Sequence, residues 1–134
     1  MKTYFVDTSF YIVFLIKSDR FHDDARRFLI GLNANFVTTD WVIAELGNAL
    51  SSLTDRLMCG KFIRNMNTEP NLTIVFHTPE LLNEARDLYE SRKDKNWSLT
   101  DCSSFVVMKK RGISAALTTD RHFIQAGFEA EFSP

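Results

Sequence analysis

Short runs of apolar and β-branched residues alternate along the chain with segments in which apolar residues recur every three or four positions. The short runs predict buried strands, and the periodic segments predict amphipathic helices. The predicted strands cover residues 3–6, 36–39, 72–76, 115–118 and 128–132, and the predicted helices cover residues 10–16, 23–32, 41–50, 54–65, 79–89, 101–110 and 122–126. This alternation predicts an α/β fold, a sandwich of helices around a mostly parallel central sheet.

Local signals at the predicted helix ends support these assignments. Ser9 and Asp40 are predicted to cap the helices that follow the first two strands. Pro79 is expected in the first turn of its helix, and Arg111-Gly112 is expected to stop the helix that ends at Lys110.

Composition indicates one soluble globular domain over residues 1–134, because hydrophobic residues make up 45% and charged residues 25%. No linker, repeat or low-complexity stretch divides the chain. Two cysteines are too few for a disulfide framework or a zinc site, so we expect reduced thiols. The N-terminus does not resemble a signal peptide, and no apolar run approaches the roughly 20 residues of a membrane span. We therefore expect a cytoplasmic protein without membrane contact.

Four acidic residues lie at positions typical of a ligand-binding or catalytic site. Asp7 and Asp120 directly follow predicted strands, and the C-terminal ends of parallel strands form the crevice in which ligands bind. Asp101 lies at a predicted helix N-terminus, and Glu45 lies on an otherwise apolar helix face, where a carboxylate needs a partner such as a metal ion. Each acid alone is explained by a turn, a cap or a solvated helix, but their conjunction favours a shared site.

Converging carboxylates suit metal-assisted hydrolysis of a phosphodiester. Carboxylate oxygens are preferred ligands of Mg²⁺ and Mn²⁺, and such an ion neutralises phosphate charge and activates water. The hydroxyls of Ser9, Ser98 and Ser103 are candidates for orienting a carboxylate, a water or a phosphate.

Four segments resemble the motifs of the PIN-domain nuclease family, and especially its VapC-like toxins. They are FVDTS at residues 5–9, WVIAE at 41–45, WSLTDCSSF at 97–105, and LTTDRHF at 117–123 followed by AGF at 126–128. The resemblance covers nearly the whole chain, and its third and fourth motifs are the most specific. Each of the four acids falls on an acidic position of the family.

The resemblance implies a three-layer α/β/α sandwich, a site that binds Mg²⁺ or Mn²⁺, cleavage of RNA, a homodimer and a small antitoxin partner. Asp7, Asp101 and Asp120 would hold the metal, and Glu45 would either ligate it or deprotonate the attacking water. The sequence leaves open both that choice and whether one ion or two are bound.

The net charge of −1 does not by itself indicate a nucleic-acid partner. Arg121, which adjoins Asp120, is the favoured phosphate-steering residue among the basic residues near the third and fourth motifs. The others are Lys93, Lys95, Lys109, Lys110 and Arg111, and most of these are expected to be solvated surface charges. His122 is expected to be structural rather than a catalytic base.

The sequence leaves alternative functions open. An aspartyl-phosphate phosphatase also begins with an Asp after its first strand, but it usually has a second Asp two positions later, where this chain has Ser9. A non-catalytic RNA-binding or scaffold module is disfavoured because all four acids are present. A solitary RNA-processing nuclease, and a regulatory role in DNA binding by an antitoxin, both stay open.

Overall fold

The computed structural model describes residues 1–132 and is built on a five-stranded sheet with the order β3-β2-β1-β4-β5. All four pairs of neighbouring strands are parallel. The strands are β1 (Lys2–Val6), β2 (Ala34–Thr39), β3 (Leu72–Val75), β4 (Ala115–Leu117) and β5 (Glu129–Ala130). The predicted parallel sheet is confirmed, and β1 lies at its centre.

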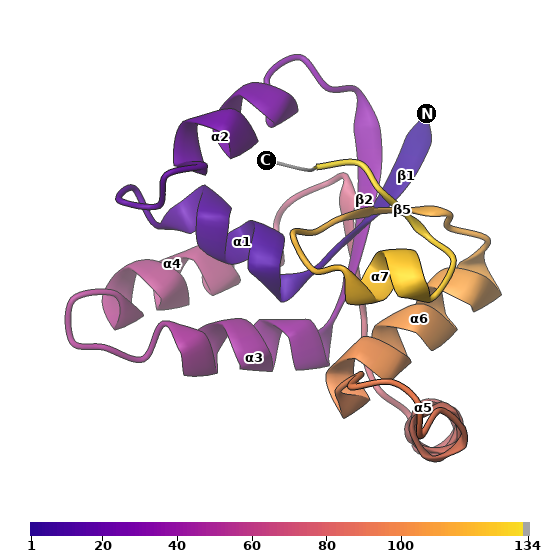
Figure 1. The fold of residues 1–134 in the computed structure, drawn as a ribbon. Coiled ribbons are helices and arrows are strands. Elements are labelled where there is room, and N and C mark those ends of the chain that lie inside the picture. The colour runs from indigo at the N-terminus through magenta and orange to yellow at the C-terminus, as the bar shows by residue number, and fades with distance from the viewer. Residues whose placement is uncertain (133–134) are drawn as a thin grey trace.

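Helices cover both faces of the sheet, as right-handed crossovers between parallel strands require (Figure 1). On one face lie α1 (Thr8–Leu15), α2 (His22–Leu29), α3 (Asp40–Ala49) and α4 (Arg56–Met66). On the other lie α5 (Pro79–Ser91), α6 (Leu99–Arg111) and α7 (His122–Gln125), with α5 packed along α6. The predicted three-layer α/β/α sandwich is confirmed.

Two of the predicted helix caps are wrong. The N-cap position of α1 is Asp7, and Ser9 lies inside the first turn of the helix. The N-cap of α3 is Thr39, whose hydroxyl accepts a hydrogen bond from the backbone N–H of Val42 at 3.1 Å. Asp40 is instead the first residue of α3, and its carboxylate is bound to another segment.

The other predicted helix ends are confirmed. Pro79 lies in the first turn of α5, behind Thr78 as the N-cap. Gly112 ends α6 with φ of 66°, a left-handed conformation that glycine adopts without the strain of a Cβ atom.

Aromatic side chains fill the core where α6 and α7 meet the sheet. Phe5 and Phe123 are fully buried, and Phe105 packs edge-on against Phe123 at 5.0 Å between ring centroids. The contact between Phe5 and Phe123 fixes α7 against β1. The segment that leads into α7 is thereby held at the C-terminal ends of the strands. Within the described residues, none of the helices has the length and apolar character needed to cross a membrane.

Candidate metal centre

Asp7 and the segment that carries Asp120 lie at the point in the sheet where the order of the strands along the chain changes direction. From β1 the chain moves to β2 on one side, whereas β4 pairs with β1 on the other side. Helices leave the sheet in opposite directions at this point, which opens a crevice at the C-terminal strand ends. Asp7 follows β1 here, and the segment carrying Asp120 follows β4.

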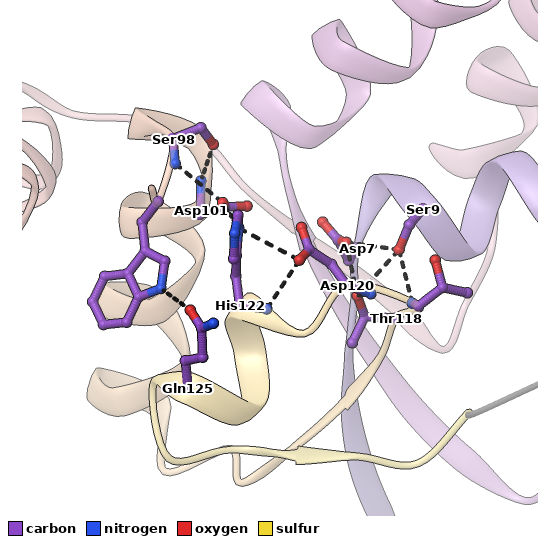
Figure 2. A network of polar contacts seen from close by, with 10 residues as sticks. Asp7, Ser9, Ser98, Asp101, Thr118, Asp120, His122 and Gln125 are labelled. Atoms are coloured by element: carbon purple, nitrogen blue, oxygen red, sulfur yellow. Dashed lines mark hydrogen bonds and ion pairs between the residues drawn. The ribbon is translucent and has the colours of Figure 1, made fainter. Parts of the chain in front are cut away.

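Asp7 is held by two hydroxyl groups, one from the first turn of α1 and one from the segment after β4. The Ser9 hydroxyl donates to Asp7 Oδ2 at 2.8 Å, and the Thr118 hydroxyl donates to the same oxygen at 2.9 Å (Figure 2). In return, the Thr118 oxygen accepts the backbone N–H of Asp120 at 2.9 Å, and the Ser9 oxygen accepts that of Thr119 at 3.0 Å. These bonds fix the β4–α7 segment relative to the start of α1.

Burial makes Asp7 an unusual carboxylate. Only 4% of the residue is exposed, and the loss of water raises the pKa of its carboxyl to about 6. The Ser9 and Thr118 hydrogen bonds favour the ionised form and oppose this rise, while the negative charge of Asp101 adds to it. The ionised carboxylate of Asp7 therefore lacks the stabilisation that water would give it, and a cation bound nearby would supply it.

Asp101 is oriented by the start of its own helix. The Ser98 hydroxyl accepts the Asp101 backbone N–H at 3.0 Å, and Asp101 Oδ2 accepts the Ser98 backbone N–H at 3.1 Å. This reciprocal capping box begins α6 and fixes the carboxylate at its N-terminus. The sequence motif around Ser98 thus serves both the helix and the site.

His122 lies between two of the carboxylates. Its Nδ1 is 2.9 Å from Asp101 Oδ2 and 3.4 Å from Asp120 Oδ1, and its backbone N–H donates to that Asp120 oxygen at 2.9 Å (Figure 2). Two flanking carboxylates place the imidazole proton on Nδ1, because only a donor fits between two acceptors. The ligand atoms of Asp101, Asp120 and His122 all lie within 4.8 Å of one another.

These residues fit a hard divalent cation. Among the described residues, no hydrogen bond reaches Asp101 Oδ1 or Asp120 Oδ2, so each carboxylate keeps one oxygen for a ligand. Carboxylate oxygens select Mg²⁺ or Mn²⁺ over softer metals. The imidazole, whose Nδ1 faces the carboxylates, is in this arrangement a positioning group rather than a ligand.

The remaining predicted site residues are placed differently. Glu45 is half-buried on α3 and is outside the group formed by Asp101, Asp120 and His122. Ser103 is fully buried, and its hydroxyl donates to the backbone carbonyl of Thr100 at 3.2 Å, so it bonds within α6. Arg121 is exposed beside Asp120, on the rim of a surface depression that Ser9, Thr119, His122 and Gln125 also line.

Sequence reasoning missed one residue of this network, Thr118. The strand pattern predicts only a strand position for Thr118, although a hydroxyl two positions before Asp120 can bond that residue's backbone N–H. His122, expected to be structural rather than a base, lies two positions after Asp120, a spacing at which its backbone N–H reaches the Asp carboxylate. Their contacts with Asp7 and Asp101 depend on tertiary structure and have no local signal.

Comparison with known proteins gives matches that cover most of the chain. The family model for the PIN domain matches residues 4–129. The chain is 28% identical over 128 residues to the 23S rRNA-specific endonuclease VapC20 of Mycobacterium tuberculosis, covering 92% of this chain and 94% of that protein. The crystal structure of that Mycobacterium protein, described as a Sarcin-Ricin loop cleaving toxin, superimposes with a TM-score of 0.86 and 26% identity, covering 97% of this chain and 98% of the other.

A more distant structure shares the fold. FitAcB from Neisseria gonorrhoeae superimposes with a TM-score of 0.61 over 94% of each chain. At 14% identity, this likeness supports the architecture alone.

Proposed function

Because the chain belongs to the PIN domain family, we propose that it is a divalent-metal-dependent endoribonuclease, acting as the toxin of a toxin–antitoxin pair. The observation that carries the proposal is the group of Asp101 and Asp120 with a free oxygen on each, beside the buried Asp7. The relative named as an rRNA-specific endonuclease supports RNA as the substrate.

Asp7, Asp101 and Asp120 would hold the metal, which we propose to be Mg²⁺ or Mn²⁺. When bound, such an ion neutralises charge on the phosphate and lowers the pKa of a coordinated water. The protein's own contribution is positioning: Ser9 and Thr118 hold Asp7, while Ser98 and His122 hold Asp101. Carboxylates held in this way need no rearrangement when phosphate charge develops, which is the main advantage of a preorganised site.

Glu45 and Arg121 have proposed roles at the margin of the site. Glu45, half-buried on the helix that follows β2, would ligate the metal or accept a proton from the attacking water. Arg121 would contact an RNA phosphate, since it is exposed beside Asp120 and lines the same depression as His122. We propose that Ser103 acts only through the helix that carries Asp101.

We also propose two protein partners, a second copy of the chain and an antitoxin. Large apolar side chains are exposed on the surface, including Leu53 and Leu57 near the start of α4, which are 87% and 83% exposed. Exposed apolar groups of this size are typical of protein–protein interfaces. A cytoplasmic location is part of the same proposal, since RNA and an antitoxin would be met there.

The proposal is tested by incubating purified protein, free of any partner, with rRNA and tRNA in Mg²⁺, Mn²⁺ or EDTA. We expect cleavage that requires metal, and a loss of roughly 100-fold or more in the Asp101→Asn variant, the scale seen when a preorganised electrostatic group is removed. Asp87→Asn is the matched control, because Asp87 is an exposed acid on α5 outside the site. Equal cleavage by the unsubstituted protein and Asp101→Asn would refute the proposal.

A further inference from the structure

A second polar and aromatic group lies at the same edge of the sheet, at the ends of β2 and β3. Asp40 and Trp41 begin α3 directly after β2, and Phe76 and His77 follow β3. Because β2 adjoins β1, this group is next to the crevice that contains Asp7. We call Asp40, Trp41, Phe76 and His77 the aromatic group.

His77 is clamped against Trp41 by Asp40. The imidazole and indole rings are nearly parallel, with 6° between their planes and 3.7 Å between their centroids. Asp40 Oδ1 lies 2.6 Å from His77 Nδ1 and also accepts the His77 backbone N–H at 3.1 Å. The carboxylate thereby sets both the position and the orientation of the imidazole, which supports one face of the indole.

This arrangement is costly to the free protein. The His77 side chain is only 7% exposed, and its Nε2 has no hydrogen-bond partner in the part of the chain that the structure describes. A buried polar atom without a partner is rare in native proteins. Phe76, beside it, is 64% exposed, and Trp41 also keeps part of its surface in solvent. The indole of Trp41 is held rigidly by His77 and stays partly exposed, and the buried Nε2 of His77 has no partner within the described residues. Such a surface is suited to a planar ligand that stacks on the indole.

One hydrogen bond joins the helix that carries Trp41 to the segment that carries Asp7. The Thr8 hydroxyl, next in sequence to Asp7, donates to the backbone carbonyl of Val42 at 3.5 Å, and Val42 follows Trp41 in α3. The start of α3, which carries the indole, is therefore held against the segment that carries Asp7. Unpaired RNA bases stack on aromatic side chains, and this stacking tolerates any base because each has a π-face.

We propose that Trp41, supported by His77 and Asp40, stacks an unpaired RNA base beside the scissile phosphate, with Phe76 as a second aromatic contact. This inference rests on the proposed nuclease function and names how the same site selects single-stranded segments of its substrate. Trp41 contacts the substrate, whereas His77 and Asp40 are positioning residues that act through it.

The test measures RNA binding without cleavage, in protein that carries Asp101→Asn. The chain has two tryptophans, so Trp97→Phe leaves Trp41 as the single indole fluorophore. The probe is a mixed-sequence RNA oligonucleotide, used single-stranded and as a duplex. We expect the single strand to quench Trp41 fluorescence and the duplex to quench it much less.

Substitution of Trp41 then separates stacking from structure. Trp41→Ala should raise the dissociation constant for the single strand roughly 5- to 150-fold, from the known range for loss of one base–aromatic stack. Trp41→Phe should restore most of the affinity, and circular dichroism melts check that both variants fold. Tyr89→Ala is the matched control, because Tyr89 is an exposed ring on α5 outside the aromatic group.

Each contrary result has a distinct meaning. Equal single-strand affinity in Trp41→Ala and in the parent overturns the inference, while the metal-dependent cleavage measured separately keeps the nuclease proposal. A change of oligomeric state in Trp41→Ala with unchanged RNA affinity assigns Trp41 to a protein interface and also overturns it. If the unsubstituted protein neither binds nor cleaves RNA, the inference and the proposed function fall together.

Discussion

At the scale of single residues, burial and hydrogen bonding act on Asp7 in opposite directions. Burial raises the pKa of its carboxyl to about 6, and the hydroxyls of Ser9 and Thr118 offset only part of that rise. Because the folded state binds the proton more tightly than the unfolded chain, this group makes the protein less stable as pH rises from about 4 to about 6. At neutral pH without metal, the ionised carboxylate is therefore a source of instability.

Asp7→Asn removes this charge while keeping the shape of the side chain. In EDTA at about pH 7.5, which is about 1.5 units above the pKa of Asp7, we expect the substitution to raise the free energy of unfolding. The increase should reach up to about 3 kcal/mol, because each unit of pKa shift corresponds to about 1.36 kcal/mol. The gain should vanish near pH 4, where both forms are neutral. Urea denaturation across this range measures the effect, with the exposed Asp87→Asn as the control; a gain independent of pH would contradict the assignment.

His122 gives a second prediction at this scale. Its imidazole orients Asp101 and approaches Asp120, so its loss should leave the two carboxylates repelling each other without support. We expect His122→Ala to weaken Mn²⁺ binding roughly 10- to 100-fold, as is typical of residues that orient ligands. Calorimetric titration of Mn²⁺ measures this, and Arg121→Ala, an adjacent exposed residue, should change the affinity little. Unchanged affinity in His122→Ala would show that the imidazole does not support the site.

At the scale of elements, two helix caps of similar geometry differ in what they hold. The Ser98 hydroxyl accepts the N–H of Asp101 at 3.0 Å, and the Thr78 hydroxyl accepts the N–H of Leu81 at 3.1 Å. The first cap orients a site carboxylate, whereas the second begins α5 outside the metal centre. The pair therefore separates helix stability from site geometry.

Ser98→Ala and Thr78→Ala should each lower the free energy of unfolding by about 1 kcal/mol, as loss of an N-cap hydroxyl usually does. Only Ser98→Ala should also lower the rate of RNA cleavage, because only Asp101 loses its orientation. Thermal melts and initial cleavage rates of the two variants provide the measurements. Equal cleavage rates in both variants would mean that the cap does not position the carboxylate.

The sequence predicts the helices and strands better than it predicts which side chain caps each helix. The five predicted strands and seven predicted helices are found near their predicted positions within the described residues. The prediction succeeds because the spacing of apolar residues reflects which face of each element is buried. The cap predictions failed at Ser9 and Asp40, where polar side chains bond instead to Asp7 and to His77. His77 lies 37 positions from Asp40, so no local pattern identifies that partner, whereas Asp7 lies only two positions before Ser9 and is a local contact that competes with capping.

The same limit applies to the candidate metal centre. The positions of Asp7 and Asp120 after adjacent strands follow from the parallel sheet and were predictable. The contact of Thr118 with Asp7 joins residues 111 positions apart, and that of His122 with Asp101 joins residues 21 apart. Such contacts are set by how α6 and α7 pack on the sheet, which the spacing of motifs does not encode.

At the scale of the whole molecule, the centre links β1, α6 and the segment after β4. A cation that binds only the assembled centre stabilises the folded state by mass action. At a free Mn²⁺ concentration 100 times the dissociation constant, we expect the free energy of unfolding to rise by about 2.7 kcal/mol. Thermal melts with and without Mn²⁺ measure this, and Asp120→Asn should reduce the gain. A gain of equal size in Asp120→Asn would place the bound ion elsewhere.

The central position of β1 has a consequence for protein synthesis. Asp7 is made early, but Asp101, Thr118 and Asp120 are made only after most of the chain, and β4 is the strand that brings Asp7 and Thr118 together. A nascent chain therefore exposes its first carboxylate on the ribosome long before the rest of the centre exists. Until synthesis reaches Asp120, the chain cannot assemble the proposed metal centre.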